Sequence, residues 1–122
     1  MKYAYGNPGW LIHLIHILVG IWLVYVGYMI LTSKKLNKVN IGILLILGIV
    51  MVAYQGWLWY KFPKKNYSLG LSGWVVHLTH IINGILFILI SKDFFNKNLS
   101  GLYLIIMGSL AAAYHLHLWY MH

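Results

Sequence analysis

The sequence has no cysteine, no arginine and no glutamate, and its single acidic residue is Asp93. Without cysteine the chain cannot form a disulfide, ligate an iron–sulfur cluster or attach haem through a thioether. Without further carboxylates it cannot build a carboxylate-bridged di-iron site, and it has neither the H-E-x-x-H motif of zinc hydrolases nor a Ser/His/Asp set. The chemistry open to this chain therefore depends on its histidines.

Charge is also scarce, because only 8% of the 122 residues are charged while 61% are hydrophobic. A soluble domain of this size carries roughly 25% charged residues. Four apolar runs are each about as long as the ~20 residues that cross the hydrocarbon core of a bilayer. They cover residues 9–32, 41–60, 73–91 and 100–120. We therefore predict an all-α, multi-pass integral membrane protein in which residues 1–122 form one membrane domain, with short linkers that make consecutive helices antiparallel.

The net charge of +8 comes from nine lysines, all outside the predicted spans. Lysines at these positions are expected to meet anionic lipid headgroups, so the predicted partner is the lipid bilayer and not nucleic acid. The side of the termini carries Lys2, Lys61, Lys64 and Lys65, and the other side carries Lys34, Lys35, Lys38, Lys92 and Lys97, offset by Asp93. Because the two sides are balanced, the positive-inside rule predicts no orientation.

An internal repeat organises the chain. The segment "GWLIHLIHILVG" (9–20) recurs as "GWVVHLTHIING" (73–84), and over eighteen aligned residues the two copies share eight identities. At an offset of sixty, "AYQGWLWY" (53–60) aligns with "AYHLHLWY" (113–120). The sequence therefore predicts two tandem hairpins of two helices each, in parallel orientation. Repeat 1 covers 9–60 and repeat 2 covers 73–120.

Six of the seven histidines are expected in one layer of the membrane. Two predicted helices begin, and the last one ends, on the side of the termini, and the histidines lie within roughly 5–10 Å of those ends. They are His13, His16, His77, His80, His115 and His117. A polar group without a partner in hydrocarbon costs about 2–7 kcal/mol, and ionisable groups at this depth usually mark a functional site. The terminal His122 is expected to be solvated.

Spacing suggests how these histidines are arranged. Residues three apart share a helix face, which brings His13 to His16 and His77 to His80. Each pair is followed four residues later by a glycine, at Gly20 and Gly84, where a neighbouring helix or a flat cofactor could approach the backbone. The last helix differs, because successive positions are ~100° apart on a helix. His117 therefore lies about 200° from His115 and is not expected to ligate the same centre.

Three interpretations of the histidine layer remain open. In the first, the histidines pack the helices and hydrogen-bond one another and nearby polar side chains. Alternatively, imidazoles on facing helices ligate a b-type haem, whose propionates would meet the lysines on the same side. A third interpretation is a Cu or Zn site. Its candidate ligands are His13, His16, His77, His80, His115 and His117. A weaker variant is a proton path, because His115 and Trp119 resemble the His-x-x-x-Trp pair of small viral proton channels.

Three segments carry a family resemblance: "HILVG" (16–20), "HIING" (80–84) and "YHLHLWY" (114–120). They resemble patterns of small four-helix transmembrane b-type cytochromes. The resemblance implies bis-histidine haem b and electron transfer with quinones, soluble carriers or partner subunits. Many members carry haems in both leaflets, whereas here one leaflet lacks histidine, so a single haem is expected. His16 and His80 are the preferred ligands, because each lies at the start of the turn that ends at the glycine four residues later. The alternates are His13, His77 and His115, with Gly20 and Gly84 beside the cofactor.

The alternative from a different functional class is that the chain has no cofactor of its own. It would then be a small accessory subunit of a larger membrane oxidoreductase complex. A homo-oligomer is a related possibility. Aromatic side chains that could face a partner protein are Trp22, Tyr25, Tyr28, Phe87 and Tyr103. The sequence therefore leaves haem, a metal ion and a purely structural role to be compared.

Overall fold

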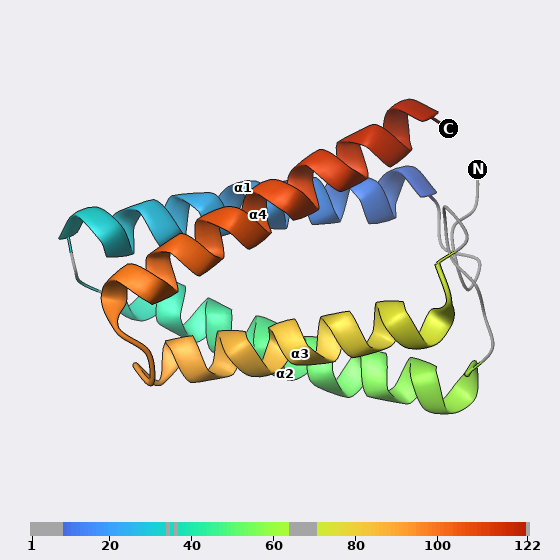
Figure 1. The fold of residues 1–122 in the computed structure, drawn as a ribbon, viewed down its shortest axis with the longest axis horizontal. Coiled ribbons are helices and arrows are strands. Elements are labelled where there is room, and N and C mark those ends of the chain that lie inside the picture. The colour runs from blue at the N-terminus through green and yellow to red at the C-terminus, as the bar shows by residue number, and fades with distance from the viewer. Residues whose placement is uncertain (1–8, 34, 36, 64–70, 122) are drawn as a thin grey trace. The chain divides into compact units, whose positions relative to one another are not determined.

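The structure is a computed structural model, and it describes residues 9–33, 35, 37–63 and 71–121. These residues form four α-helices and no strand: α1 (Gly9–Ser33), α2 (Lys38–Lys61), α3 (Gly73–Ser91) and α4 (Lys97–Met121) (Figure 1). By length and apolar composition each of the four could cross a membrane. The predicted all-α class is confirmed, with four helices that are long and apolar enough to cross a membrane. Lys2, Lys34, Lys64, Lys65 and His122 lie outside the described residues.

Two helices begin earlier than their apolar runs. α2 and α4 each start three residues before the predicted span, immediately after an asparagine. The side-chain oxygen of Asn37 accepts the backbone N–H of Val39 at 2.8 Å, and that of Asn96 accepts the N–H of Leu99 at 2.7 Å. Asparagine is a favoured N-cap because it satisfies amide groups that have no helical acceptor. The capping residue therefore determines where each of these helices begins, although the first turn is polar.

The ends of α2 and α3 also follow from local chemistry. α2 ends at Lys61 because the next residue, Phe62, precedes Pro63, and proline disfavours the helical conformation of the residue before it. At the end of α3 the N–H of Phe94 donates to the carbonyl of Leu89 at 3.0 Å, and Asp93 lies in the left-handed region with φ 58°. This is a Schellman motif with an aspartate at the position where glycine is usual.

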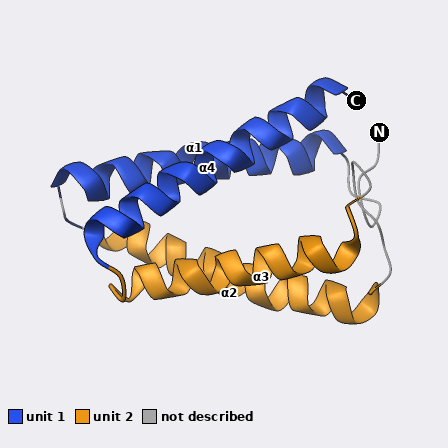
Figure 2. Ribbon diagram, viewed as in Figure 1, with its two compact units in different colours: residues 1–35, 96–122 blue, residues 36–95 orange. Residues whose placement is uncertain are grey.

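The chain divides into two compact units, each an antiparallel helix pair (Figure 2). Unit 1 contains α1 packed on α4, and unit 2 contains α2 packed on α3. Each unit therefore combines one helix from each of the two predicted hairpins. Buried apolar side chains fill both pairs: Leu23, Val26, Ile30, Leu104 and Leu118 in unit 1, and Leu44, Leu58, Phe87 and Ile90 in unit 2.

Both pairs cross at glycines that occupy aligned positions of the repeat. In unit 1 a Cβ added to Gly20 would lie 2.6 Å from the carbonyl oxygen of Gly108. In unit 2 a Cβ added to Gly84 would lie 2.8 Å from the carbonyl oxygen of Gly48. Only glycine allows two helix backbones to approach this closely. The aligned halves of the sequence thus make the same kind of helix crossing.

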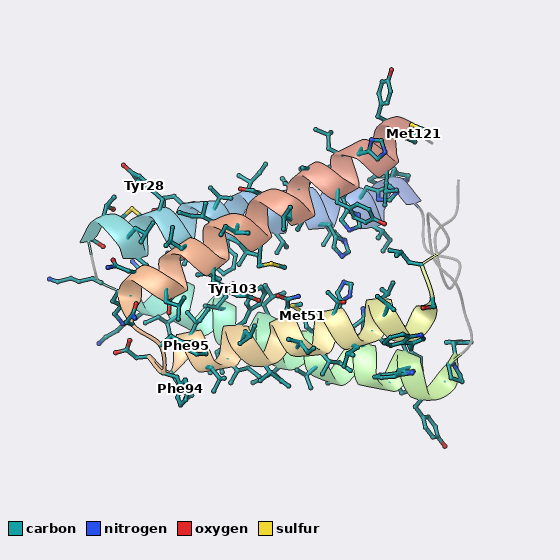
Figure 3. All side chains as sticks on the ribbon, in the orientation of Figure 1. Tyr28, Met51, Phe94, Phe95, Tyr103 and Met121 are labelled. Atoms are coloured by element: carbon teal, nitrogen blue, oxygen red, sulfur yellow. The ribbon has the colours of Figure 1, made fainter. Side chains whose placement is uncertain are left out.

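The aromatic side chains predicted to face a partner differ in exposure. Tyr25 and Tyr28 are more than half exposed, and Tyr28 projects away from α1 (Figure 3). Trp22 and Tyr103 are half-buried. Phe87 is only 3% exposed, so its prediction as a partner-facing residue is wrong. It lies one turn from Gly84 on the buried face of α3, and its bulk fills the core of unit 2.

Candidate functional site

A buried histidine pair joins the two helices of unit 1. Nδ1 of His13 on α1 lies 3.0 Å from Nδ1 of His115 on α4. His13 is 0% exposed and His115 is 8% exposed. For a hydrogen bond between these atoms, one imidazole must donate its N–H and the other must accept. One ring therefore carries a hydrogen on Nδ1 and the other does not, and that hydrogen lies between the two nitrogens. Unit 1 thus brings together histidines from both predicted hairpins.

Unit 2 has a corresponding pair, in which an amide replaces one imidazole. Nδ1–H of His77 on α3 donates to Oε1 of Gln55 on α2 at 2.7 Å. His77 is also 0% exposed, and the ring of Trp59 stacks on it at 6.3 Å. In the repeat alignment His77 corresponds to His13, and Gln55 corresponds to His115. Sequence reasoning gave Gln55 no role, although the alignment with His115 was the signal that could have found it.

The second histidine of each H-x-x-H pair is held differently. Nδ1 of His16 lies 2.7 Å from the carbonyl oxygen of Ile12, and Nδ1 of His80 lies 2.7 Å from that of Val76. A carbonyl oxygen only accepts, so Nδ1 carries the hydrogen in both rings. In the neutral imidazole the lone pair is then on Nε2. Histidines that ligate metals typically donate their other ring N–H in this way.

In unit 1 the ring of His16 also lies on the ring of His115. Their centroids are 3.9 Å apart and their planes differ by 22°. The ring of Tyr114 meets His115 edge-on at 5.3 Å. His13, His16 and His115 therefore form a three-ring group, which we call the imidazole cluster. His117 is exposed, as expected from its angular separation from His115.

The two glycines predicted beside the cofactor have a packing role instead. The atoms that a Cβ on Gly20 would meet are Gly108 O, Ala112 N and Ala112 Cβ, all on α4. Gly84 meets Gly48 and its neighbours on α2 in the same way. Because a helix already occupies the space in front of each glycine, a porphyrin cannot lie there. Of the two alternatives that small residues allow, the structure shows helix packing.

A metal ion and a haem require different sets of donor side chains. Within the described part of the chain, no group of three or more His, Asp, Glu or Cys side chains could hold a metal ion. Zn sites need at least three protein ligands, whereas haem iron needs one imidazole at each axial position. In unit 1 the facing nitrogens of His13 and His115 are hydrogen-bonded to each other. The imidazoles whose Nε2 has the lone pair are that of His16 in unit 1 and that of His80 in unit 2.

Comparisons with known protein families, with curated proteins and with solved structures find no match. The description of the site therefore depends on its geometry and on the motifs of the chain itself.

Proposed function

We propose that the chain is an integral membrane protein that binds one haem b and transfers electrons, with His16 and His80 as the candidate residues that would hold it. One observation carries the proposal. At two aligned positions of the repeat, the same residue donates Nδ1–H to the carbonyl four residues earlier, at the same 2.7 Å. In both neutral imidazoles the lone pair is then on Nε2, the nitrogen that would bind haem iron. When bound, the haem supplies a one-electron redox centre whose potential depends on its ligands and their burial.

The residues around the ligands have separate tasks. The carbonyls of Ile12 and Val76 hold the tautomer of His16 and His80 and orient each ring on its own helix. Because these carbonyls carry negative partial charge, they also raise the basicity of the opposite ring nitrogen. His13 and His77 instead bond across to the neighbouring helix and hold each pair together. In each H-x-x-H motif the first histidine packs and the second ligates.

Membrane insertion is supported by the outer surfaces of the helices. Large apolar side chains lie exposed along all four, for example Leu18, Ile46, Ile82 and Ile106. In water such surfaces would drive aggregation, whereas in a bilayer they contact lipid. The apolar exterior and the buried polar pairs together fit a membrane-embedded cofactor protein.

The test is an absorption spectrum together with elemental analysis of the same purified sample, before and after reconstitution with haemin. We expect a Soret band, α and β bands that sharpen on reduction, and about one iron per chain. His16→Ala and His80→Ala should each remove the low-spin spectrum. The matched control His117→Ala, at an exposed position of α4, should keep it.

Two results would overturn the proposal. The first is the absence of a Soret band in every redox state after reconstitution, and the second is stoichiometric Cu or Zn in place of iron. Recovery of the chain only together with larger subunits, and without haem, would indicate an accessory subunit instead.

A further inference from the structure

The two helices of unit 1 come from opposite ends of the chain. Unit 1 combines Met1–Lys35 with Asn96–His122, whereas unit 2 is the continuous stretch Leu36–Phe95 (Figure 2). We propose that α1 and α4 are an exchangeable pair, through which two copies of this chain form a closed dimer in which α1 of each copy crosses α4 of the other. This inference goes beyond the proposed function and requires no haem.

The crossing of α1 on α4 depends on glycine at two levels. A Cβ on Gly20 would lie 2.6 Å from the carbonyl oxygen of Gly108, and a Cβ on Gly27 would lie 2.6 Å from that of Gly101. Both oxygens belong to the main chain of a helix, so they cannot rotate away from an added side chain. The face of α1 therefore fits a helix that has glycine at both matching positions.

Unit 2 has glycine at one of these levels and larger residues at the other. In the repeat alignment Ser91 of α3 corresponds to Gly27, and Ile41 of α2 corresponds to Gly101. In the place of Gly27, Ser91 would put its Cβ against the carbonyl oxygen of Gly101. In the place of Gly101, Ile41 would put its Cβ 2.9 Å from the carbonyl oxygen of Gly27. The helix that fits α1 is thus an α4, whether it belongs to the same chain or to another copy.

The contact between His13 and His115 adds to this selectivity. Their Nδ1 atoms are 3.0 Å apart, and both rings are buried between α1 and α4. Separated helices would turn both imidazoles toward hydrocarbon, where a polar group without a partner is costly. In the proposed dimer, His115 of one copy completes the imidazole cluster of the other.

The linkers between the two units favour exchange. Residues 34–37 join α1 to α2, and residues 92–96 join α3 to α4. Asp93 in the second linker has a φ of 58°, in the left-handed region that is costly for a residue with a Cβ. Short hinge loops under strain invite domain swapping. Swapping is a low-cost route to a dimer, because the same helix crossings form between two copies as within one.

Single cysteines can detect the exchange, because the wild-type chain has no cysteine. Two differently tagged full-length copies are co-expressed, one with His13→Cys on α1 and the other with His115→Cys on α4. The membranes are then treated with a short bismaleimide. Each copy has one thiol, so a cross-linked species with both tags reports α1 of one copy beside α4 of the other. The second crossing of that dimer keeps both histidines.

The matched control replaces His115→Cys with His117→Cys, at an exposed position about 200° away on the same helix. We expect His13→Cys to cross-link with His115→Cys and to give only background with His117→Cys.

One further substitution, placed in either copy, tests the direction of the pairing. Gly108→Ile puts a side chain against the carbonyl oxygen of Gly20, where a Cβ alone would lie at 2.5 Å. In the copy with His115→Cys it blocks the α4 that carries the thiol, so we expect the cross-link to fall to background. In the copy with His13→Cys it blocks an α4 without a thiol, so we expect the cross-link to persist.

The absence of a species with both tags from His13→Cys and His115→Cys would overturn the inference. An equal yield with His117→Cys would overturn it as well, as would an equal effect of Gly108→Ile in the two copies, because the contact would then not be the α1–α4 crossing. If chains with Gly108→Ile do not accumulate in the membrane, the comparison of His115→Cys with His117→Cys decides alone. A protein without haem refutes the proposed function and leaves this test unaffected.

Discussion

Gly20 of α1 and Gly108 of α4 meet backbone to backbone, so that a Cβ on Gly20 would lie 2.6 Å from the carbonyl oxygen of Gly108. The next obstacle, the amide nitrogen of Ala112, is 2.9 Å away. Both obstacles are main-chain atoms of a helix and cannot rotate away as a side chain would. The crossing of unit 1 therefore depends on the absence of a side chain at this position.

We predict that Gly20→Ala destabilises the α1–α4 pair. Inserting a methyl group into a closed contact forces the backbones apart, which costs about 1–3 kcal/mol in packed interiors. Gly42→Ala and Gly56→Ala are matched controls, because a Cβ at either position meets nothing within 4 Å. Denaturant titration in detergent micelles measures the difference. Equal stability of Gly20→Ala and the two controls would contradict the crossing described here.

The equivalent change in unit 2 should behave independently. Gly84→Ala places a Cβ against Gly48, Met51 and Val52, whereas Gly20→Ala places one against Gly108 and Ala112. Substitutions that share no partners usually add to within about 0.5 kcal/mol. We therefore expect the double variant Gly20→Ala/Gly84→Ala to lose the sum of the two single losses. A clearly smaller or larger loss, measured in the same micelles, would show that the two crossings are coupled.

The hydrogen bond between Gln55 and His77 should be measurable by a double-mutant cycle. Gln55→Leu removes the acceptor at 2.7 Å from His77 Nδ1, and His77→Leu removes the donor. Hydrogen bonds between membrane helices contribute about 0.6 kcal/mol on average and up to ~1.7. We expect a coupling energy in this range from unfolding in micelles.

A matched cycle with Asn37→Ala provides the control for this coupling. Asn37 caps the other end of α2, eighteen residues or ~27 Å along the helix from Gln55. The loss of the cap should cost about 0.5–2 kcal/mol by itself and show no coupling to Gln55→Leu. Coupling as large as that of the His77 cycle would mean that the substitutions act through general loosening of α2.

Hydropathy was sufficient to predict the four helices, because an apolar run of membrane length is a strong signal. It could not predict the helix pairs, since helices that are apolar on all sides carry little periodic information about which face is buried. The spacing of His13 and His16 placed both on one face but could not separate their roles. Those roles depend on which acceptor each Nδ1 reaches, and that depends on the rotamer. For Gly20, the sequence allowed a helix or a cofactor, and only the packing of α4 decided between them.

Asp93 offers a stabilising substitution at the end of α3. Its φ of 58° lies in the left-handed region, which costs residues with a Cβ roughly 1–2 kcal/mol relative to glycine. We predict that Asp93→Gly raises the free energy of unfolding by about 1 kcal/mol, and that Asp93→Ala lowers it. Asp93→Asn removes the same charge while tolerating this conformation, so it isolates the backbone effect. If Asp93→Gly and Asp93→Asn gain equally, charge and not conformation is responsible.

The assignment of His16 and His80 as ligands can be tested by returning the lost imidazole from solution. His16→Gly and His80→Gly each remove a ring and leave a space of its size, so both should lose the low-spin haem spectrum. Added imidazole should restore that spectrum, because the free ring supplies the same nitrogen to the iron. His13→Gly should destabilise unit 1, since it removes a fully buried ring bonded to His115, but it should keep the low-spin spectrum in the fraction that folds. Titration of each variant with imidazole, followed at the Soret band, distinguishes the two roles. Restoration by imidazole in His13→Gly, with no loss in His16→Gly, would exchange the assignment of the two histidines.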